Sequence, residues 1–163
     1  MAFAFLMSAV VVSSTIDPRV EVLISKMTVA EKAGQLGVFS RPAGSDYNPG
    51  TNSSAGWNQT VALLKQGAIG SLYNGAGVKA NLALQRVAVD ESRLGIPLIF
   101  GADVWHGFHS IFPIPLGEAA SWEPALANLT ARATAIEATA AGIQWTYSPM
   151  VDVARDQRCV VSC

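Results

Sequence analysis

The chain has 163 residues, with 11 lysines and arginines against 12 aspartates and glutamates, so its net charge is −1. Hydrophobic residues make up 50% of it, charged residues 14%, and the mean hydropathy is +0.31. This composition excludes an intrinsically disordered chain, which needs low hydrophobicity and a high net charge. It also excludes a protein with a strongly basic nucleic-acid-binding surface, and two cysteines do not make a disulfide framework.

The amino-terminal segment 1–16 is predicted to be a leader. Its run from Ala2 to Val12 is apolar except for Ser8, and small residues follow at 13–15. The run is too short to span a bilayer, which takes about 20 residues. It matches the apolar part of a secretory signal, although no positive charge precedes it. The pattern favours a secreted or periplasmic protein, with a buried strand or a wrongly chosen gene start as the alternative.

Two short helices are predicted next. Asp17 and Pro18 are typical of a helix start, since Asp caps the amino terminus and Pro fits the first helical position. Thr28 and Glu31 have the spacing of a capping box, which predicts a second start. The first helix carries an apolar face at helical spacing: Val20, Leu23, Ile24 and Met27.

From residue 41 onward, helical patterns alternate with short apolar runs. We predict a loop over 41–56, a helix over 61–66, a strand over 68–73, a helix over 79–93, a strand over 97–100, a loop over 112–121 that could continue into a short strand, a helix over 124–141 and a strand over 143–153. Strands that alternate with helices indicate βαβ units and a parallel sheet, so the fold class is α/β.

Asp103 follows the apolar run that is predicted as the strand over 97–100, directly after Gly101 and Ala102. In parallel α/β folds ligands bind at the carboxyl ends of the strands. A carboxylate there can accept hydrogen bonds from hydroxyl groups, as binding of a sugar requires; an Asp that caps a turn is the alternative. Asp152 ends the last predicted strand in the same way, and the charged residues after it can pair with one another: Arg155, Asp156 and Arg158.

Other chemical motifs are weak. His106 and His109 form an H-x-x-H pair, but zinc sites usually have three or four ligands and the chain has no further histidine. We therefore expect no metal, and a hydrogen bond that positions each imidazole ring. The chain has no Walker loop, G-x-S-x-G elbow or full dinucleotide fingerprint. Three of the four tryptophans, Trp105, Trp122 and Trp145, are expected in the core, although Trp105 stands beside Asp103.

Five segments occur in an order that is typical of one enzyme family. They are Met27–Leu36 (MTVAEKAGQL), Glu91–Leu98 (ESRLGIPL), Gly101–Gly107 (GADVWHG), Phe112–Gly117 (FPIPLG) and Tyr147–Asp156 (YSPMVDVARD). Together they resemble the amino-terminal part of glycoside hydrolase family 3, near its periplasmic-type β-glucosidases. The resemblance covers residues 17–158 and leaves 159–163 as a divergent tail.

The resemblance implies a retaining β-glycosidase whose first domain is a (β/α)8 barrel. Such a barrel takes about 250 residues, so this chain is expected to form only its amino-terminal βα units. Retention needs an aspartate nucleophile and a carboxylic acid about 5 Å apart. In the family both lie downstream of the segment that matches Tyr147–Asp156, so no catalytic residue is expected here. Two carboxylates suffice for the chemistry, so no cofactor is implied.

The resemblance also implies roles for residues of the sugar site. Asp103 matches the aspartate that binds sugar hydroxyls in the family. His109 stands where some relatives have an arginine and is a candidate sugar ligand, as is Trp105. His106 is expected to shape the loop, and Arg155 to lie near the site without touching the sugar.

The match breaks at Cys159, where relatives continue toward a further sugar-binding arginine. We therefore expect a shortened product of a longer gene, which sequencing of the transcript across Arg158 and Cys159 tests. The expected partner is an oligosaccharide or glucoside, bound by the longer parent protein, and not a nucleic acid or a membrane. The alternatives are a non-catalytic remnant that binds saccharides or a partner, and an unrelated small α/β domain. Without either catalytic carboxylate the chain is expected to be inactive alone. With too few strands to close a barrel it is expected to be poorly soluble, or molten and aggregating.

Overall fold

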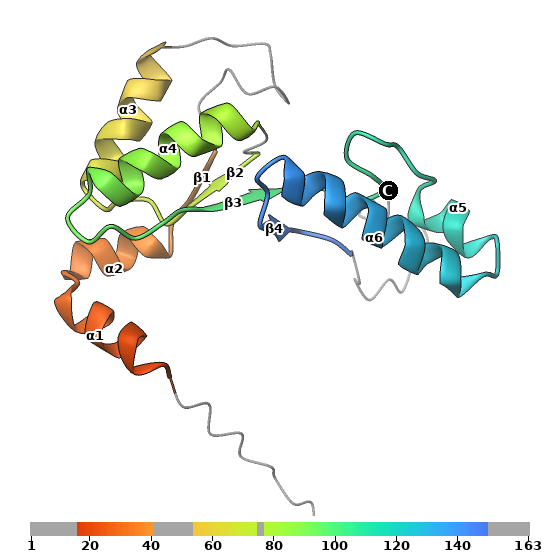
Figure 1. Ribbon diagram of the computed structural model, residues 1–163, viewed down its shortest axis with the longest axis horizontal. Coiled ribbons are helices and arrows are strands. Elements are labelled where there is room, and N and C mark those ends of the chain that lie inside the picture. Colours follow the sequence, from red (N-terminus) through yellow and green to blue (C-terminus); the bar gives the residue numbers. More distant parts are fainter. Residues whose placement is uncertain (1–15, 41–53, 75–76, 150–163) are drawn as a thin grey trace, which may run out of the picture.

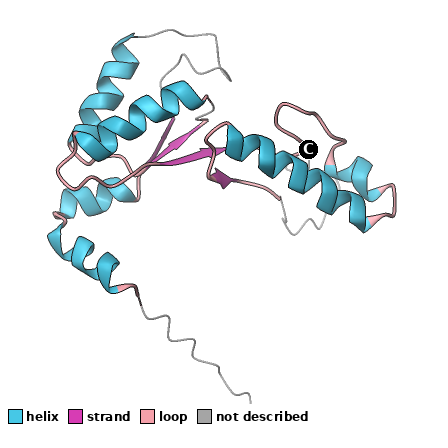
Figure 2. Ribbon diagram, viewed as in Figure 1, coloured by secondary structure: helices cyan, strands magenta, loops and turns pink. Residues whose placement is uncertain are grey.

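The computed structural model describes residues 16–40, 54–74 and 77–149. Its centre is a parallel sheet of four strands in the order β1 (Val38–Ser40), β2 (Ser71–Tyr73), β3 (Ile99–Ala102) and β4 (Trp145–Thr146) (Figures 1 and 2). Each strand pairs with its neighbour in the chain, and helices make every crossover. The predicted α/β class and parallel sheet are confirmed.

The two helix starts predicted near the amino terminus are confirmed. In α1 (Pro18–Lys26) the Asp17 carboxylate accepts a hydrogen bond from the Arg19 backbone N–H at 2.8 Å. In α2 (Val29–Gln35) Thr28 and Glu31 form the full capping box. The apolar face of α1 is not buried, however, because α1 extends away from the sheet (Figure 1).

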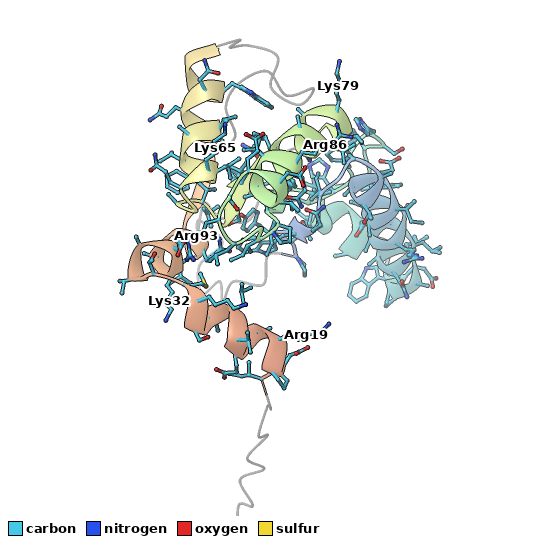
Figure 3. All side chains as sticks on the ribbon, turned by 60° about the vertical axis from the view of Figure 1, so that its left-hand side comes forward. Arg19, Lys32, Lys65, Lys79, Arg86 and Arg93 are labelled. Atoms are coloured by element: carbon cyan, nitrogen blue, oxygen red, sulfur yellow. The ribbon has the colours of Figure 1, made fainter. Side chains whose placement is uncertain are left out.

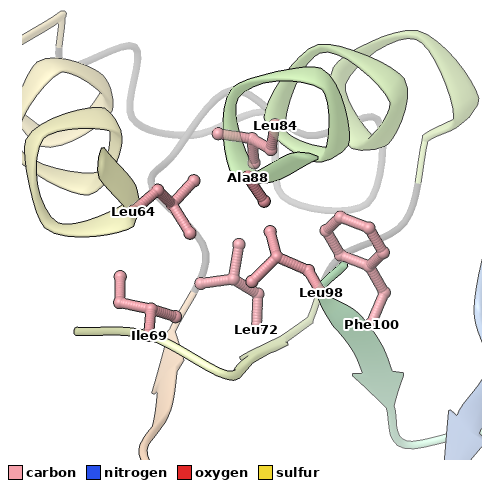
Figure 4. Packing of buried hydrophobic residues seen from close by; sticks show 7 residues of the cluster. All are labelled: Leu64, Ile69, Leu72, Leu84, Ala88, Leu98 and Phe100. Atoms are coloured by element: carbon pink, nitrogen blue, oxygen red, sulfur yellow. The ribbon is translucent and has the colours of Figure 1, made fainter. Parts of the chain in front are cut away.

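The main core lies between the sheet and two helices, α3 (Ser54–Lys65) and α4 (Val78–Asp90) (Figure 4). Leu72 of β2 and Leu84 of α4 are fully buried at its centre. The other buried members are Leu64, Ile69, Ala88, Leu98 and Phe100. The apolar positions at helical spacing that predict the helix over 79–93 therefore form the face of α4 that packs on the sheet.

The amino-terminal helix α2 sits close to the segment that leads into β2. A Cβ atom at Gly70 would clash with the Gln35 carbonyl oxygen, and one at Gly34 would clash with the backbone at Gly67 and Ala68. Only glycine permits this approach. A bidentate ion pair also holds this helix, because Arg93, which Figure 3 labels, donates to the Glu31 carboxylate at 2.9 and 2.6 Å.

Two helices, α5 (Pro115–Ala119) and α6 (Pro124–Ala140), connect β3 to β4. A second, smaller core joins α6 to the sheet through Ala102, Val104, Ala138 and Ile143. The prediction of a loop or strand over 112–121 is wrong, because Pro115 is the first residue of α5. A proline has no backbone N–H to lose at that position, so it starts a helix as readily as it shapes a turn.

The remaining differences concern lengths. The predicted strands over 68–73 and 97–100 are observed as β2 and β3, shifted toward their carboxyl ends. Within the described residues the last strand has only Trp145 and Thr146, and β1 is a strand that the sequence did not indicate. The helix predicted over 61–66 begins earlier, at Ser54.

Some predictions concern residues outside the described part of the chain. They are residues 1–15 of the leader over 1–16, most of the loop over 41–56, Asp152, Arg155 and the tail. No helix in the described part is long and apolar enough to cross a membrane.

Candidate functional site

Three neighbouring strands bring polar and aromatic side chains to one edge of the sheet. Tyr73 is the last residue of β2, Asp103 follows β3 directly, and Tyr147 follows β4 directly. Because parallel strands end at the same edge, these residues meet although they are far apart in the chain. Asp103 therefore lies at the carboxyl end of its strand, as the sequence predicts.

Within the described residues, the Asp103 carboxylate has one hydrogen-bond donor on each oxygen. The Tyr73 hydroxyl donates to Oδ2, and the Trp105 indole N–H donates to Oδ1 at 3.3 Å. A carboxylate oxygen accepts more than one hydrogen bond, so each oxygen keeps a free acceptor position. The two donors hold the plane of the carboxylate, and the remaining acceptor positions suit hydroxyl groups of a ligand.

Both tyrosines stay protonated near neutral pH. The pKa of Tyr73 is raised because its hydroxyl donates to Asp103, and burial adds to the effect. The pKa of Tyr147 is raised by burial first and by the Asp103 charge second. The phenols are thus neutral hydrogen-bonding neighbours of the Asp103 carboxyl group.

Aromatic rings surround this carboxylate. The ring centroids of Tyr73 and Tyr147 are 5.5 Å apart in an edge-to-face arrangement, and those of Trp145 and Tyr147 are 4.8 Å apart. Gly101 makes room for the Tyr147 ring, since a Cβ atom there would lie 2.9 Å from the phenol oxygen. The absence of a side chain at Gly101 therefore lets this ring approach the backbone of β3.

A short loop from His106 to Phe112 follows Asp103 and is closed at its base. The Phe112 N–H donates to the His106 carbonyl oxygen at 2.7 Å, and Gly107 and Ile111 form an isolated antiparallel bridge. Gly107 has a φ of +112°, a conformation that favours glycine. The Phe108 and His109 rings meet edge to face at 4.4 Å between centroids.

The Glu137 carboxylate of α6 binds the tip of this loop. Hydrogen bonds from the Ser110 hydroxyl and backbone N–H, and from the His109 N–H, lower the pKa of Glu137 below its usual value of 4.5. The carboxylate is therefore charged at neutral pH and acts as an acceptor.

Comparison with known proteins decides the family. The profile described as "Glycosyl hydrolase family 3 N terminal domain" matches residues 28–162. The chain belongs to glycosyl hydrolase family 3. The resemblance that the five ordered segments carry is thereby confirmed.

Relatives of known structure and name agree with this family. The periplasmic beta-glucosidase of Salmonella typhimurium is 38% identical over 143 residues, which is 87% of this chain and 17% of that protein. The beta-glucosidase of Listeria innocua in complex with glucose superposes with a TM-score of 0.72 at 33% identity, covering 85% of this chain and 20% of that one. The same enzyme in complex with isofagomine gives a TM-score of 0.69 at 32% identity, covering 87% and 19%.

The chain spans about a fifth of the length of these family 3 relatives. Its four strands are consecutive, parallel and joined by helices, so it contains amino-terminal βα units of the family's (β/α)8 domain. The family match runs to residue 162, past the boundary that we predict at 158. The division into 1–16, 17–158 and 159–163 stays a prediction.

The structure brings together some of the family 3 residues that the sequence singles out. Asp103 and Trp105 are in contact. The expectation that Trp105, Trp122 and Trp145 lie in the core is wrong, because Trp105 and Trp145 are each 41% exposed and Trp122 is 92% exposed. The expected ring hydrogen bond of His106 is missing at Nδ1, which is buried without a partner in the described part of the chain. His109 is exposed, and its backbone N–H donates to Glu137.

Three contributors to the site were missed. Tyr73 ends a predicted strand, so its place at the sheet edge could have been inferred from the alternation of strands and helices. Tyr147 begins the last of the five segments. Glu137 gave no signal, because a single acidic residue in a helix is usually solvated. Within the described residues no group of three or more His, Cys, Asp and Glu side chains could hold a metal ion.

Proposed function

We propose that this chain supplies the part of a β-glucosidase active site that binds the hydroxyl groups of a terminal β-D-glucosyl residue. The observation that carries the proposal is the position of Asp103 at the carboxyl end of β3, with its carboxylate held by Tyr73 and Trp105. Sugar sites combine carboxylate acceptors for hydroxyls with aromatic faces for the apolar side of the ring. Trp105 and Trp145 are half-exposed beside Asp103 and Tyr147 and can supply such faces.

Hydrolysis with retention needs two more carboxyl groups, a nucleophile and an acid/base, about 5 Å apart. The family resemblance places both beyond Asp152, and a Lys-His pair that binds the sugar lies there too. We therefore propose that the 163-residue chain holds a sugar without cleaving it, and that cleavage needs the remaining part of the family 3 enzyme. No cofactor takes part in that scheme.

A second candidate function is non-catalytic, with the chain acting as a saccharide-binding or partner-binding remnant. The exposed apolar side chains of α6 favour it, since Leu129 is 66% exposed and Ile136 is 56% exposed. Both candidates share the Asp103 cluster. They differ in whether a longer product of the gene hydrolyses β-glucosides, so an assay on that longer product separates them.

The decisive experiment combines an activity assay and a binding assay on the purified chain. We expect no release of the aryl group from an aryl β-glucoside above a buffer blank. Tryptophan fluorescence should nevertheless respond to glucose, since Trp105 and Trp145 lie at the site. Asp103→Asn should weaken this response about 10-fold or more, because hydrogen bonds to a charged acceptor are the stronger ones.

The matched control is Asp90→Asn, which removes the same charge at the exposed end of α4. It should leave the fluorescence titration unchanged. Turnover that disappears in Asp103→Ala would refute the inactivity of the chain. Equal titrations for the Asp103 and Asp90 variants would refute the sugar-binding role of Asp103.

We also propose a secreted or periplasmic location and a role in carbohydrate metabolism. The apolar run from Ala2 to Val12 and the periplasmic relative from Salmonella support the location. Expression in a bacterial host followed by osmotic-shock fractionation tests it. Recovery of the chain in the cytoplasmic fraction, with an uncleaved amino terminus, would contradict the proposal.

A further inference from the structure

In the part of the chain that the structure describes, the Glu137 side chain binds the tip of the loop 106–112. Glu137 lies in α6, 27 and 28 residues away from the two residues that it binds. Its Oε2 accepts the backbone N–H of His109 at 3.0 Å and that of Ser110 at 2.9 Å. Its Oε1 accepts the Ser110 hydroxyl at 2.5 Å. Two successive backbone N–H groups that meet one carboxylate make short, charge-assisted hydrogen bonds.

The position of Glu137 is itself fixed by packing. The next residue, Ala138, is 7% exposed and packs with Ala102 and Val104, which flank Asp103 in the chain. Phe108 of the loop packs against the same cluster. A shift of α6 relative to β3 would therefore disturb this small core, so the carboxylate of Glu137 is held at a set place relative to the backbone of Asp103.

The side chain of His109 has little else to hold it. It is exposed, and its ring contacts the Phe108 ring at 4.4 Å between centroids. Closure of the loop base by the His106 carbonyl oxygen and the Phe112 N–H fixes the two ends of the loop but not its tip. The direction of the His109 side chain thus depends on where Glu137 places the His109 backbone N–H.

We propose that Glu137 is a positioning residue of the saccharide site: it fixes the tip of the loop 106–112, and with it the direction of His109, relative to Asp103. This inference rests on the proposed function, because His109 matters here only if a saccharide binds at the Asp103 cluster. Glu137 touches no substrate in this scheme and acts through the two backbone N–H groups.

Amide hydrogen exchange of the full 163-residue chain is the first test. In Glu137→Ala the amides of His109 and Ser110 should exchange at least 10-fold faster, while the amide of Leu84 in the main core keeps its rate. Ser110→Ala removes only the hydroxyl bond and should give a smaller increase. The matched control is Glu123→Ala, which removes the same charge at the start of α6, where the side chain makes no capping hydrogen bond.

Glucose titration by tryptophan fluorescence is the second test. Glu137→Ala should weaken binding several-fold, Glu137→Asp should recover part of the loss because it keeps the charge, and Glu123→Ala should bind as the unsubstituted chain does. Unchanged exchange at residues 109 and 110, or faster exchange throughout the chain, would overturn the inference. Equal glucose affinities for the Glu137 and Glu123 variants would overturn it as well. Absence of glucose binding by the unsubstituted chain would overturn the proposed function, whereas the exchange rates still decide whether Glu137 fixes the loop.

Discussion

At the scale of single residues, the hydroxyl of Tyr73 helps to orient the carboxylate of the candidate site. It donates to Oδ2 of Asp103 from the end of the neighbouring strand, and the Trp105 indole N–H donates to the other oxygen. A carboxylate with a donor on each oxygen cannot turn about its last bond without losing both. The acceptor positions that remain for a sugar are thus set before the sugar arrives, which lowers the ordering cost of binding.

Replacement of Tyr73 by Phe tests this effect. The variant keeps the ring and its contact with Tyr147 but removes one donor to Asp103. A hydrogen bond to a charged group contributes about 1.5–3 kcal/mol, so we expect glucose affinity to fall about 10-fold in a fluorescence titration. Tyr147→Phe is the matched control, since no hydrogen bond joins Tyr147 to Asp103 in the described part of the chain. A larger loss in the control than in Tyr73→Phe would contradict the prediction.

At the scale of elements, α2 is docked by close backbone approach and by one ion pair. The approach depends on Gly34 and Gly70, and the ion pair joins Glu31 to Arg93. Arg93 also donates to the Lys26 carbonyl oxygen at 2.9 Å, near the end of α1. Both contacts tie the start of the described chain to the segments that enter β2 and β3.

Gly70→Ala should loosen this docking. The added methyl group would clash with the Gln35 carbonyl oxygen, which is backbone and cannot move aside cheaply. Overpacking of this kind costs about 1–3 kcal/mol, so the urea midpoint of the chain should fall. Ala30→Ser adds one atom on the exposed face of the same helix and should leave the midpoint within error. A Gly70→Ala variant as stable as Ala30→Ser would show that the approach is not tight.

The ion pair gives the stability of the chain a pH dependence. Hydrogen bonds from Arg93 and from the Thr28 backbone lower the pKa of Glu31 from 4.5 to about 2. A lowered folded-state pKa means that this contribution is complete above pH 4.5 and is lost as the pH falls from 4.5 toward 2. Urea midpoints measured across this window should fall for the unsubstituted chain and fall less for Glu31→Gln. Parallel curves for the two would exclude Glu31 as the source.

At the scale of the whole molecule, large apolar side chains on several elements face solvent. Leu36 is 86% exposed at the end of α2, and Leu116 is 77% exposed in α5. The two outer strands β1 and β4 each pair on one side only within the described residues. Exposed apolar faces and open strand edges favour association between chains.

We therefore expect association that increases with protein concentration. Light scattering after size exclusion should show species larger than 17.1 kDa. The double variant Leu129→Glu with Ile136→Lys changes two exposed positions of α6 and should raise the monomer fraction. Ala135→Glu with Thr139→Lys is the matched control on exposed positions of the same helix without loss of apolar surface. A monomeric unsubstituted chain with a sharp cooperative melt would contradict the expectation.

Local signals in the sequence predict the helix starts well, because the caps at Asp17 and Thr28 involve residues two or three positions apart. Signals that depend on distant neighbours are weaker. The strand β1 has only three residues, and its pairing with β2 alone defines it. The apolar repeat of α6 correctly predicts a helix, but the face that is buried carries Thr134 and Ala138.

In the candidate site, too, local signals are predictable and contacts between distant residues are not. Asp103 could be placed from its position after an apolar run and from the family resemblance. Tyr73 reaches it from 30 residues away, and that contact depends on the register between β2 and β3, which no local pattern encodes. The link between Glu137 and Ser110 likewise depends on how α6 crosses the end of the sheet.

The order of the strands in the sheet has a consequence for how the chain folds. Each described strand pairs with the strand that precedes it in the chain. Strand pairing therefore needs no partner from the far end of the sequence. Within the described residues, two hydrogen bonds at the sheet edge that carries Asp103 join residues 30 and 44 positions apart: Tyr73 with Asp103, and Val104 with Ser148. The entropy of loop closure rises only slowly with length, and short separations favour rapid folding. The edge that carries Asp103 can thus assemble progressively during synthesis, from β1 toward β4, as each unit leaves the ribosome.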